Sequence, residues 1–404
     1  MSAKPASRPT IPRPIWVLGL VSLTMDLSSE MIHALLPLFI TSTLGASALA
    51  LGLIEGVAES VALITKVFSG ALSDRLGNRK TLAACGYTLS AATKPLFAAA
   101  TSLGLVVVAR FADRFGKGVR GAPRDALIGE WSPPDARGAS FGLRQGLDTV
   151  GAFLGPLVAV AIMWSSDGNI RLVFAIACVP AVLSAALIIF GVSEPDRIQP
   201  EEDKAPYRVR AALASFDRKF WAVIGIATIF TLARFSEAFL VLRLDSLGLP
   251  GTLIPFVLVV MNISYSLSSY PAGLLSDRTG RTGLLGGGLV VLIAADAVLA
   301  LAQSTFVAFA GIFLWGLHMG LTQGVISALT ADHAPRRFLG TAFGVLNLSM
   351  GLSVLAASIL AGALWELVGP AGTFWAGAGF ATLALAGLTL LPYLHRKSRR
   401  AATM

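Results

Sequence analysis

The chain has 404 residues, of which 55% are hydrophobic and 14% charged, and its formal net charge at pH 7 is +9. This composition excludes a soluble globular domain, and two cysteines are too few for a disulfide framework. The positive charge does not predict a nucleic-acid partner, because most Lys and Arg residues fall in alternate polar loops between apolar runs. We therefore expect an integral membrane protein whose partner is the lipid bilayer.

Twelve apolar runs follow one another, each close to the roughly 20 residues that a helix needs to cross a bilayer. They predict an all-α membrane protein with twelve transmembrane helices near residues 15–40, 49–73, 80–101, 104–130, 138–163, 171–192, 219–241, 252–275, 282–302, 305–331, 339–364 and 371–394. One long polar stretch divides these helices six and six. The predicted parts are a tail (1–14), a six-helix bundle (15–192), a linker (193–218), a second six-helix bundle (219–394) and a tail (395–404).

The basic residues predict on which side of the membrane each loop lies. With the amino terminus inside, the cytoplasmic segments hold 21 Lys and Arg residues, whereas the outer loops hold two, Arg171 and Arg243. Loops rich in Lys and Arg stay in the cytoplasm. We therefore expect a multi-pass protein of the cytoplasmic (inner) membrane, with both termini and the linker in the cytoplasm. No cleaved signal peptide is expected, because the first apolar run is too long.

The first span carries three titratable residues, Asp26, Glu30 and His33, whose spacing of i, i+4 and i+7 places them on one helical face. A charge at mid-membrane costs about 2.5–3.5 kcal/mol on insertion scales and is a functional candidate by default. Carboxyl groups in an apolar cavity can exchange protons near physiological pH. Asp26 and Glu30 are therefore candidates for proton coupling, and His33 is a candidate for the substrate cavity.

A polar turn between the second and third spans reads Gly70-Ala-Leu-Ser-Asp74-Arg75-Leu-Gly77-Asn-Arg79-Lys80. It returns 203 positions later as Gly273-Leu-Leu-Ser-Asp277-Arg278-Thr-Gly280-Arg281. Two further matches lie half a chain apart, Ser29-Glu30 with Ser236-Glu237 and Gly138–Gly142 with Gly340–Gly344. A distinctive loop that recurs at half the length of the chain indicates an internal duplication.

This turn resembles the motif A loop between helices 2 and 3 of the major facilitator superfamily, and the duplication extends the resemblance over nearly the whole chain. The resemblance implies two pseudo-symmetric six-helix bundles with a substrate site between them, and transport by alternating access. It also implies that the loop stabilises the cytoplasmic closure of the outward-open state. The residues with this expected gating role are Gly70, Asp74, Arg75, Gly77, Arg79, Asp277 and Arg278.

The fourth span is the most highly charged, with Arg110, Asp113, Arg114, Lys117, Arg120, Arg124 and Asp125. Most of its bases share one helical stripe, which membrane burial tolerates only against a watery cavity or acidic neighbours. Residues 110–118 resemble motif B of the superfamily, whose Arg is often tied to proton coupling, with Asp113 and Arg114 in place of the usual amide and glycine. The resemblance implies a coupling role for Arg110, and Asp113 and Arg114, which replace the usual residues beside it, are further candidates for proton coupling.

Further residues within the spans are candidates for the substrate cavity, which in this family is lined by helices 1, 4, 7 and 10. Besides His33, these candidates are Glu59, Arg144, Asp148, Arg234, Glu237, Trp315, His318 and Gln323. The alternative is a closed network of ion pairs, since nine acids stand against nine bases within the spans. Arg234 and Glu237, three residues apart, also fit a local pair.

The fifth span contains Gly151-Ala-Phe-Leu-Gly155-Pro156, which resembles motif C of the drug and proton antiporters of the superfamily. Small residues four apart permit close helix contact, and Pro156 frees a backbone carbonyl and bends the helix. The matching stretch of the second half, Ser353 to Ser358, lacks the pattern. This element favours export over uptake.

Together these features predict a monomeric, proton-coupled secondary transporter that exports a small amphiphilic organic compound. The proton is the expected coupling ion; no cofactor or metal is expected, since the chain has neither a G-x-x-x-x-G-K-[ST] phosphate loop nor an H-E-x-x-H motif. The alternative is proton-coupled uptake of an anionic metabolite or a siderophore-like metal chelate, which the basic stripe of the fourth span favours. An enzyme is not expected; a membrane sensor or intramembrane enzyme is the remote alternative.

Overall fold

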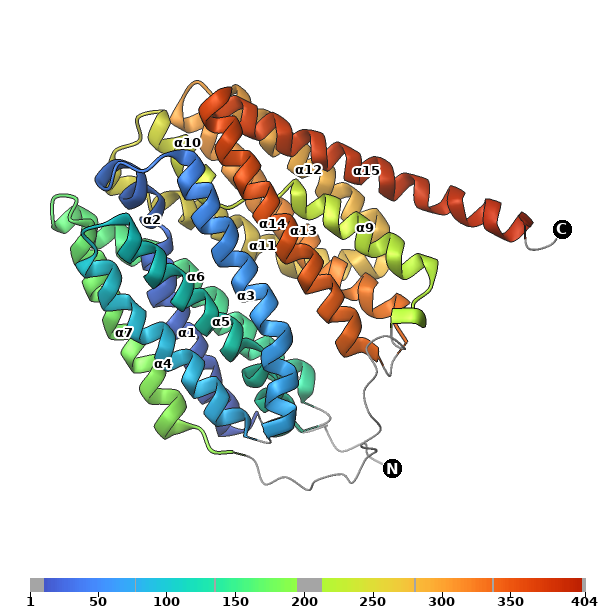
Figure 1. Ribbon diagram of the computed structural model, residues 1–404, viewed down its shortest axis with the longest axis horizontal. Coiled ribbons are helices and arrows are strands. Elements are labelled where there is room, and N and C mark those ends of the chain that lie inside the picture. Colours follow the sequence, from blue (N-terminus) through green and yellow to red (C-terminus); the bar gives the residue numbers. More distant parts are fainter. Residues whose placement is uncertain are drawn as a thin grey trace, which may run out of the picture.

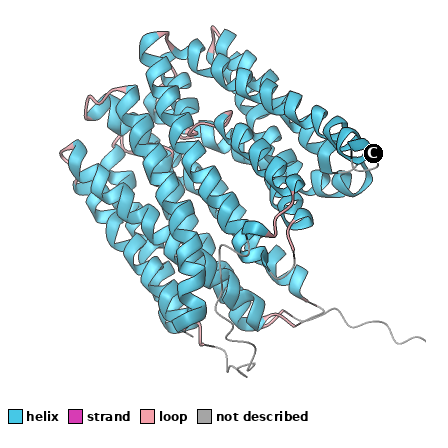
Figure 2. Ribbon diagram, turned by 45° about the vertical axis from the view of Figure 1, so that its right-hand side comes forward, coloured by secondary structure: helices cyan, strands magenta, loops and turns pink. Residues whose placement is uncertain are grey.

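The computed structural model describes residues 11–76, 78–133, 136–194, 213–279, 281–335 and 338–401. In these ranges all regular secondary structure is helical (Figure 2). Lipid favours helices for such apolar runs, because a helix satisfies its backbone hydrogen bonds within its own segment. Residues 195–212 of the predicted linker, and 1–10 and 402–404 of the predicted tails, lie outside the described residues.

In the described part of the first half, six spans follow one another. The first consists of α1 (Arg13–His33), the short α2 (Leu36–Leu38) and a π turn, η1 (Phe39–Thr43). The other five are α3 (Ala48–Leu76), α4 (Arg79–Ala99), α5 (Leu103–Trp131), α6 (Arg137–Ser165) and α7 (Ile170–Gly191). Asn78 and Asn169 cap α4 and α7, because their side chains accept hydrogen bonds from first-turn amides at 3.0 and 3.1 Å.

The second half begins with α9 (Arg218–Leu232) and α10 (Ala238–Ser246), which together form the seventh span. A short 3₁₀ turn, η2 (Gly251–Leu253), leads to the remaining helices α11 (Phe256–Thr279), α12 (Arg281–Leu301), α13 (Thr305–His333), α14 (Leu339–Leu367) and α15 (Pro370–Ala401). Asp217 caps α9 by accepting a hydrogen bond from the amide of Phe220 at 2.8 Å. The last helix continues beyond residue 394, where the sequence predicted its end.

Nine of the described helical segments are long and apolar enough to cross a membrane. The other three of the twelve predicted spans are α4, which is rich in Ala, Ser and Thr, the highly charged α5, and the interrupted pair α9–α10. The charges of α5 are acceptable in lipid because they point into the protein: Arg110 and Arg114 are each 2% exposed. The prediction of an all-α protein with twelve transmembrane helices is confirmed.

The helices form two bundles that lie side by side, the first coloured blue to green and the second yellow to red in Figure 1. In the first bundle α1 packs on α6 and α7, and α5 packs on α3 and α4. In the second bundle α12 packs on α13 and α15, and α9 packs on α14 and α15. The bundles meet where α3 packs along α14 and α6 packs on α11.

Small residues close the bundles against each other at one end of the molecule. We call this the distal end; it carries the loops before α3 and after α6, whereas α1 and α9 begin at the opposite, basic end. A Cβ atom at Gly362 of α14 would lie 2.7 Å from the carbonyl oxygen of Ala48, so only glycine permits this approach. The carboxylate of Glu366 also accepts a hydrogen bond from the amide of Leu49 at 2.7 Å. These contacts seal the distal end.

The first span of each half is interrupted, which the sequence did not predict. In the seventh span the helix stops at Leu232 and restarts at Ala238, so the predicted continuous helix over 219–241 is wrong. Ser236 stabilises the restart, because its hydroxyl accepts a hydrogen bond from the amide of Ala238 at 3.2 Å. Its own amide donates to the hydroxyl of Ser358 at 3.2 Å. The freed backbone groups are thus satisfied by side chains rather than by a continuous helix.

Candidate functional site

A cavity of about 380 Å³ lies between the two bundles. The first bundle contributes residues of α1, α3, α5 and α6, and these include Asp26, Glu30, His33, Glu59, Arg114, Lys117 and Asp148. The second bundle contributes residues of α9, α11, α13, α14 and the interruption between α9 and α10, and these include Arg234, Phe235, Ser236, Glu237, Met261, Tyr265, Trp315 and Met319. A site between the halves is the arrangement expected for a duplicated transporter.

The cavity opens towards the basic end. Lys117 and Gln145, which line it on that side, are exposed, whereas Phe235, Ser236 and Trp315 on the distal side are buried. Beyond them the contacts between α3 and α14 close the distal end. The conformation is therefore open at the basic end and closed at the distal end.

The wall contributed by α1 and α6 is acidic. The carboxyl groups of Asp26 and Asp148 approach each other within hydrogen-bonding range. Two carboxyl groups can make such a bond only when one of them carries a proton. The close approach of the two helices depends on Gly151 and Gly155 of α6, because a Cβ atom at Gly155 would lie 2.7 Å from the Cβ of Glu30.

A chain of charged side chains leads from this wall into the first bundle. His33 Nδ1 lies 3.4 Å from Glu30 Oε2, and His33 Nε2 lies 4.0 Å from Glu55 Oε2. Glu55 is bound by Arg110 at 2.6 Å between Oε2 and Nη2, in a pair whose side chains are 1% and 2% exposed. Alternating acidic and basic side chains thus connect the cavity with the interior of the first bundle, in the order Glu30, His33, Glu55 and Arg110.

Two further ion pairs hold Asp113 and Arg114 of α5. Lys94 Nζ lies 2.9 Å from Asp113 Oδ1 and donates to the hydroxyl of Ser29 at 3.1 Å, which joins α4, α5 and α1. At the cavity, Arg114 Nη1 lies 3.2 Å from Glu59 Oε1. Glu59 is 31% exposed, so this pair, unlike the one between Lys94 and Asp113, can meet a solute in the cavity.

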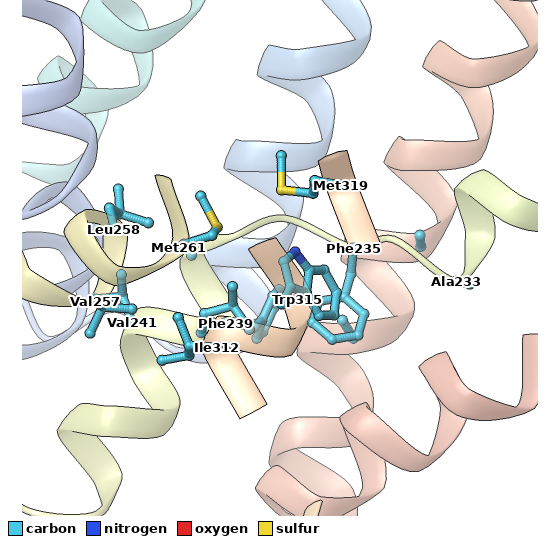
Figure 3. Close-up of a cluster of buried hydrophobic side chains, with 14 of the residues drawn as sticks. Ala233, Phe235, Phe239, Val241, Val257, Leu258, Met261, Ile312, Trp315 and Met319 are labelled. Atoms are coloured by element: carbon cyan, nitrogen blue, oxygen red, sulfur yellow. The ribbon is translucent and has the colours of Figure 1, made fainter. Parts of the chain in front are cut away.

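The wall contributed by the second bundle is largely aromatic. Figure 3 shows Phe235 beside Trp315, with Met261 and Met319 around them. The rings of Phe235 and Trp315 have centroids 5.3 Å apart. Arg234 lies over the ring of Phe230, 5.7 Å from its centroid, and the structure records no ion pair between it and Glu237, both of which are described. The predicted local pair of Arg234 and Glu237 is therefore wrong, because the helix is interrupted between them.

Most of the predicted cavity residues line the cavity, but two do not. The cavity face of α6 carries Gln145, Asp148, Thr149 and Ala152, and Arg144 lies off this face and binds Asp148 Oδ2 at 3.0 Å. His318 is 0% exposed and turned towards α12, with Nδ1 2.8 Å from the carbonyl oxygen of Gly288. The predicted coupling residues Arg110 and Asp113 also lie behind the cavity wall. The side chain of Gln323 lies outside the described residues.

Several cavity residues were not among the sequence candidates, notably Lys117, Gln145 and Met319. Lys117 continues the stripe of Arg110 and Arg114 at helical spacing, so the sequence alone could have identified it as a cavity candidate. Gln145 and Met319 carried no signal, because which face of a helix meets the cavity is set by packing between helices.

The turn after α3 ties several helices together at the basic end. Arg79 Nη1 lies 2.6 Å from Glu130 Oε1 at the end of α5. The carboxylate of Glu194 accepts hydrogen bonds from the amides of Arg79 and Lys80 at 2.9 and 2.7 Å. Gly70 faces α5, since a Cβ there would lie 3.4 Å from the Cβ of Ala122. The other predicted gating groups, namely Gly77 and the side chains of Asp74, Arg75, Asp277 and Arg278, lie outside the described residues.

Pro156 explains one bond between the bundles. Proline has no amide hydrogen, so the carbonyl of Ala152 four residues earlier has no donor within α6. Asn262 of α11 donates its side-chain Nδ2 to that carbonyl at 3.0 Å. The carbonyl that Pro156 was predicted to free is therefore used to join α6 to α11.

We expect Asn262→Leu to weaken this junction and to favour conformations in which α6 and α11 separate at the distal end. Pro156→Ala should act in the same direction, because its new amide bonds to Ala152 within α6. Spin-label distances between Ser165 and Leu253 measure the effect, and both variants should show longer distances. The double variant should add little, since both changes remove one bond.

The matched control is Asn347→Leu, which removes a half-buried amide of α14 for which the structure records no hydrogen bond among the described residues. This variant should keep the wild-type distances. Unchanged distances in both Asn262→Leu and Pro156→Ala would show that the bond does not hold the helices together.

Comparisons with known proteins agree with this architecture. The family model of the Major Facilitator Superfamily matches residues 18–250 and 238–403. An uncharacterized MFS-type transporter of Methanocaldococcus jannaschii is 32% identical over 388 residues, which cover 93% of this chain and 94% of that protein. The inner membrane metabolite transport protein YhjE of Escherichia coli is 26% identical over 356 residues, covering 80% and 79%.

Among solved structures, a peptide transporter POT in complex with sulfate superposes with a TM-score of 0.77 at 16% identity, covering 95% of both chains. At this identity the likeness concerns the fold alone. The family match and the archaeal relative, in contrast, extend over nearly the whole sequence, and they indicate a transporter rather than an enzyme. The chain belongs to the Major Facilitator Superfamily, a family of multi-pass membrane transporters.

Proposed function

We propose that this protein is a proton-coupled exporter of a small amphiphilic organic compound and works as a monomer by alternating access. The observation that carries the proposal is a cavity with one charged and one aromatic wall, whose charged wall brings the carboxyl groups of Asp26 and Asp148 together. The aromatic and methionine side chains suit an apolar body, and the charged wall suits a single polar or charged group.

The proposal of proton coupling rests on the acidic residues of the cavity wall contributed by α1 and α6. Asp26 is the proposed carrier, with Glu30 as the second candidate, because Asp26 faces another carboxyl group whereas Glu30 faces His33. Asp148 is held by Arg144 and lies 4.0 Å from Arg124, so it has cations that stabilise its charge when Asp26 takes the proton. A cationic group of the substrate would compete with the proton for the same carboxyl groups.

Export is favoured by the glycines and proline of α6, because Gly151 to Pro156 resemble motif C of the drug and proton antiporters. These residues place α6 directly against Asp26 and Glu30 and supply the carbonyl that binds α11, so this helix connects the acidic wall to the junction between bundles. The turn after α3 would act as the gate at the other end, where its contacts to α5 and Glu194 assemble the first bundle.

The basic end is the proposed cytoplasmic side, with both termini in the cytoplasm of a cell whose inner membrane holds the protein. The support is the excess of Lys and Arg in the loops of that end. The related protein YhjE of Escherichia coli is itself an inner membrane transport protein. The conformation described above would then be the inward-open one.

Uptake of an anionic metabolite or metal chelate is the second candidate function. It is favoured by three bases that line the cavity, Arg114, Lys117 and Arg234. Of these, Lys117 and Arg234 form no recorded ion pair within the described residues, so they remain available to an anion.

A ligand screen followed by a transport assay tests the proposal. Lipophilic amines, amphiphilic acids, polar anionic metabolites and metal chelates would be compared by thermal shift of the purified protein. Hits would then be loaded into proteoliposomes with an imposed pH gradient. Export predicts that amphiphilic hits move against the direction of proton flow. Hits confined to polar anions or chelates that move together with protons would replace export by uptake.

A further inference from the structure

A second cavity, of about 180 Å³, lies within the second bundle at its basic end, apart from the cavity between the bundles. It is enclosed by α9, α12, α13 and α15. Its interior is formed by aliphatic side chains, Val223, Ile226, Leu285, Ile326, Leu329 and Leu388. A dry aliphatic cavity gives a polar solute or a water molecule no hydrogen-bond partner, so its natural occupant is a hydrocarbon group.

The mouth of this cavity is polar and basic. Lys219, Thr282 and His333 line it, and they stand at the second position of α9, the second position of α12 and the last position of α13. Lys219 is exposed, and among the described residues the structure records no ion pair for it. The neighbouring acids are engaged elsewhere: Asp217 caps α9, and Asp332 pairs with Arg281. A cation that has no recorded ion pair with any described residue therefore stands at the entrance of an aliphatic cavity.

An aromatic cluster marks the depth of this mouth in the membrane. Phe216 and Phe220 stack with centroids 4.1 Å apart, and Trp221 meets Phe220 edge to face at 5.5 Å. Trp221 is 45% exposed. Exposed tryptophan at the end of a transmembrane helix is typical of the level of the lipid headgroups. The mouth of the cavity thus lies where the phosphate groups of lipids are found.

We propose that this cavity binds one acyl chain of an anionic phospholipid, whose headgroup phosphate lies at Lys219. The bilayer supplies both chemical parts at the right depth, a hydrocarbon chain for the interior and a negative group for the mouth. Basic pockets between transmembrane helices are a recurring form of lipid recognition. The binding site itself does not depend on what the transporter carries.

Lipid in this cavity would support α9 in its observed position. The same helix continues from the cavity, lined by Val223 and Ala227, to Thr231 on the wall of the substrate cavity. On its way the hydroxyl of Thr228 bonds to that of Ser349 on α14 at 2.6 Å. An acyl chain bound in the second cavity therefore contacts a helix that both lines the substrate cavity and packs on α14.

The test uses the purified full-length protein in nanodiscs of phosphatidylcholine or of phosphatidylglycerol with identical chains. Phosphatidylglycerol should raise the melting temperature of the wild type relative to phosphatidylcholine. Native mass spectrometry should show one retained phosphatidylglycerol. Ala227→Phe places a ring in the cavity, and Lys219→Gln removes the cation. Each variant should reduce the difference in melting temperature between the two lipids by at least half.

Arg13→Gln is the matched control, because it removes an exposed cation from the start of α1 at the same end of the molecule. It should keep the full preference for phosphatidylglycerol. Equal melting temperatures in the two lipids, or a full preference in Lys219→Gln, would overturn the proposal even if Ala227→Phe fails to fold. Soluble glycerol phosphate has no acyl chain and should therefore have no effect. Stabilisation by glycerol phosphate alone would show that binding does not depend on the acyl chain.

Discussion

Replacing Asp26 by Asn is expected to abolish transport driven by a pH gradient while leaving exchange of substrate across the membrane at equal pH on both sides. The amide keeps the size of the carboxyl group and can still bond to Asp148, but it cannot release a proton. In the wild type, addition of a transported compound to the protein in weakly buffered detergent solution should change the pH of the medium. In Asp26→Asn this proton release or uptake should be lost, because the proposed proton carrier is replaced by an amide that does not titrate.

Asp167→Asn is the matched control for this change. Asp167 is an exposed residue of the loop after α6 with a φ angle of 51°, a conformation that Asn adopts as readily as Asp. It should transport like the wild type. Glu30→Gln tests the second candidate in the same assay. Full accumulation driven by the pH gradient in both Asp26→Asn and Glu30→Gln would exclude both residues, and Asp148 or Glu59 would then have to carry the proton.

Breaking the pair between Glu55 and Arg110 is expected to have the largest effect on stability. Both side chains are at most 2% exposed, so Arg110→Met leaves the charge of Glu55 in the interior of the first bundle without its main partner. Loss of one member of a buried pair costs about 3–5 kcal/mol. Thermal unfolding in mild detergent should show a large fall in melting temperature for Arg110→Met.

The double variant Glu55→Leu/Arg110→Met should recover much of this loss, because neither charge is then left unpaired. The control is the exposed pair between Arg281 and Asp332, whose side chains are 39% and 50% exposed. Arg281→Gln should cost no more than about 1 kcal/mol, since water screens such a pair. A melting temperature of Arg110→Met equal to that of the wild type would show that Arg110 has no structural role.

The two predictions separate groups that the sequence could not separate. Asp26 and Arg110 both appeared as charges within spans, and both were candidates for proton coupling. In the structure Asp26 lines the cavity, whereas Arg110 lies behind the wall and binds Glu55. The closed network of ion pairs, considered as the alternative to a functional site, describes Arg110, Lys94 and Asp113 well. Its outer members, Glu30, Glu59 and Arg114, line the cavity.

The sequence by itself determined the number of spans, their approximate bounds, the duplication and the family. These properties depend on local quantities: twenty apolar residues must become a helix in lipid, and a loop repeated half a chain later requires a repeated fold. The face of α1 that carries Asp26, Glu30 and His33 also follows from helical spacing alone, and all three residues line the cavity.

Only the tertiary structure decided which charges meet and where the seventh span is interrupted. Glu55 and Arg110 are 55 residues apart, and Ala152 and Asn262 are 110 apart, so no spacing along one helix relates them. The rotation of each helix about its axis is set by contacts such as Gly155 on Glu30, and a turn of one residue moves a side chain by about 100°. That is why Asp148 reaches the cavity and Arg144 does not. The same packing lets Ser236 and Ser358 satisfy the backbone that the interrupted seventh span exposes.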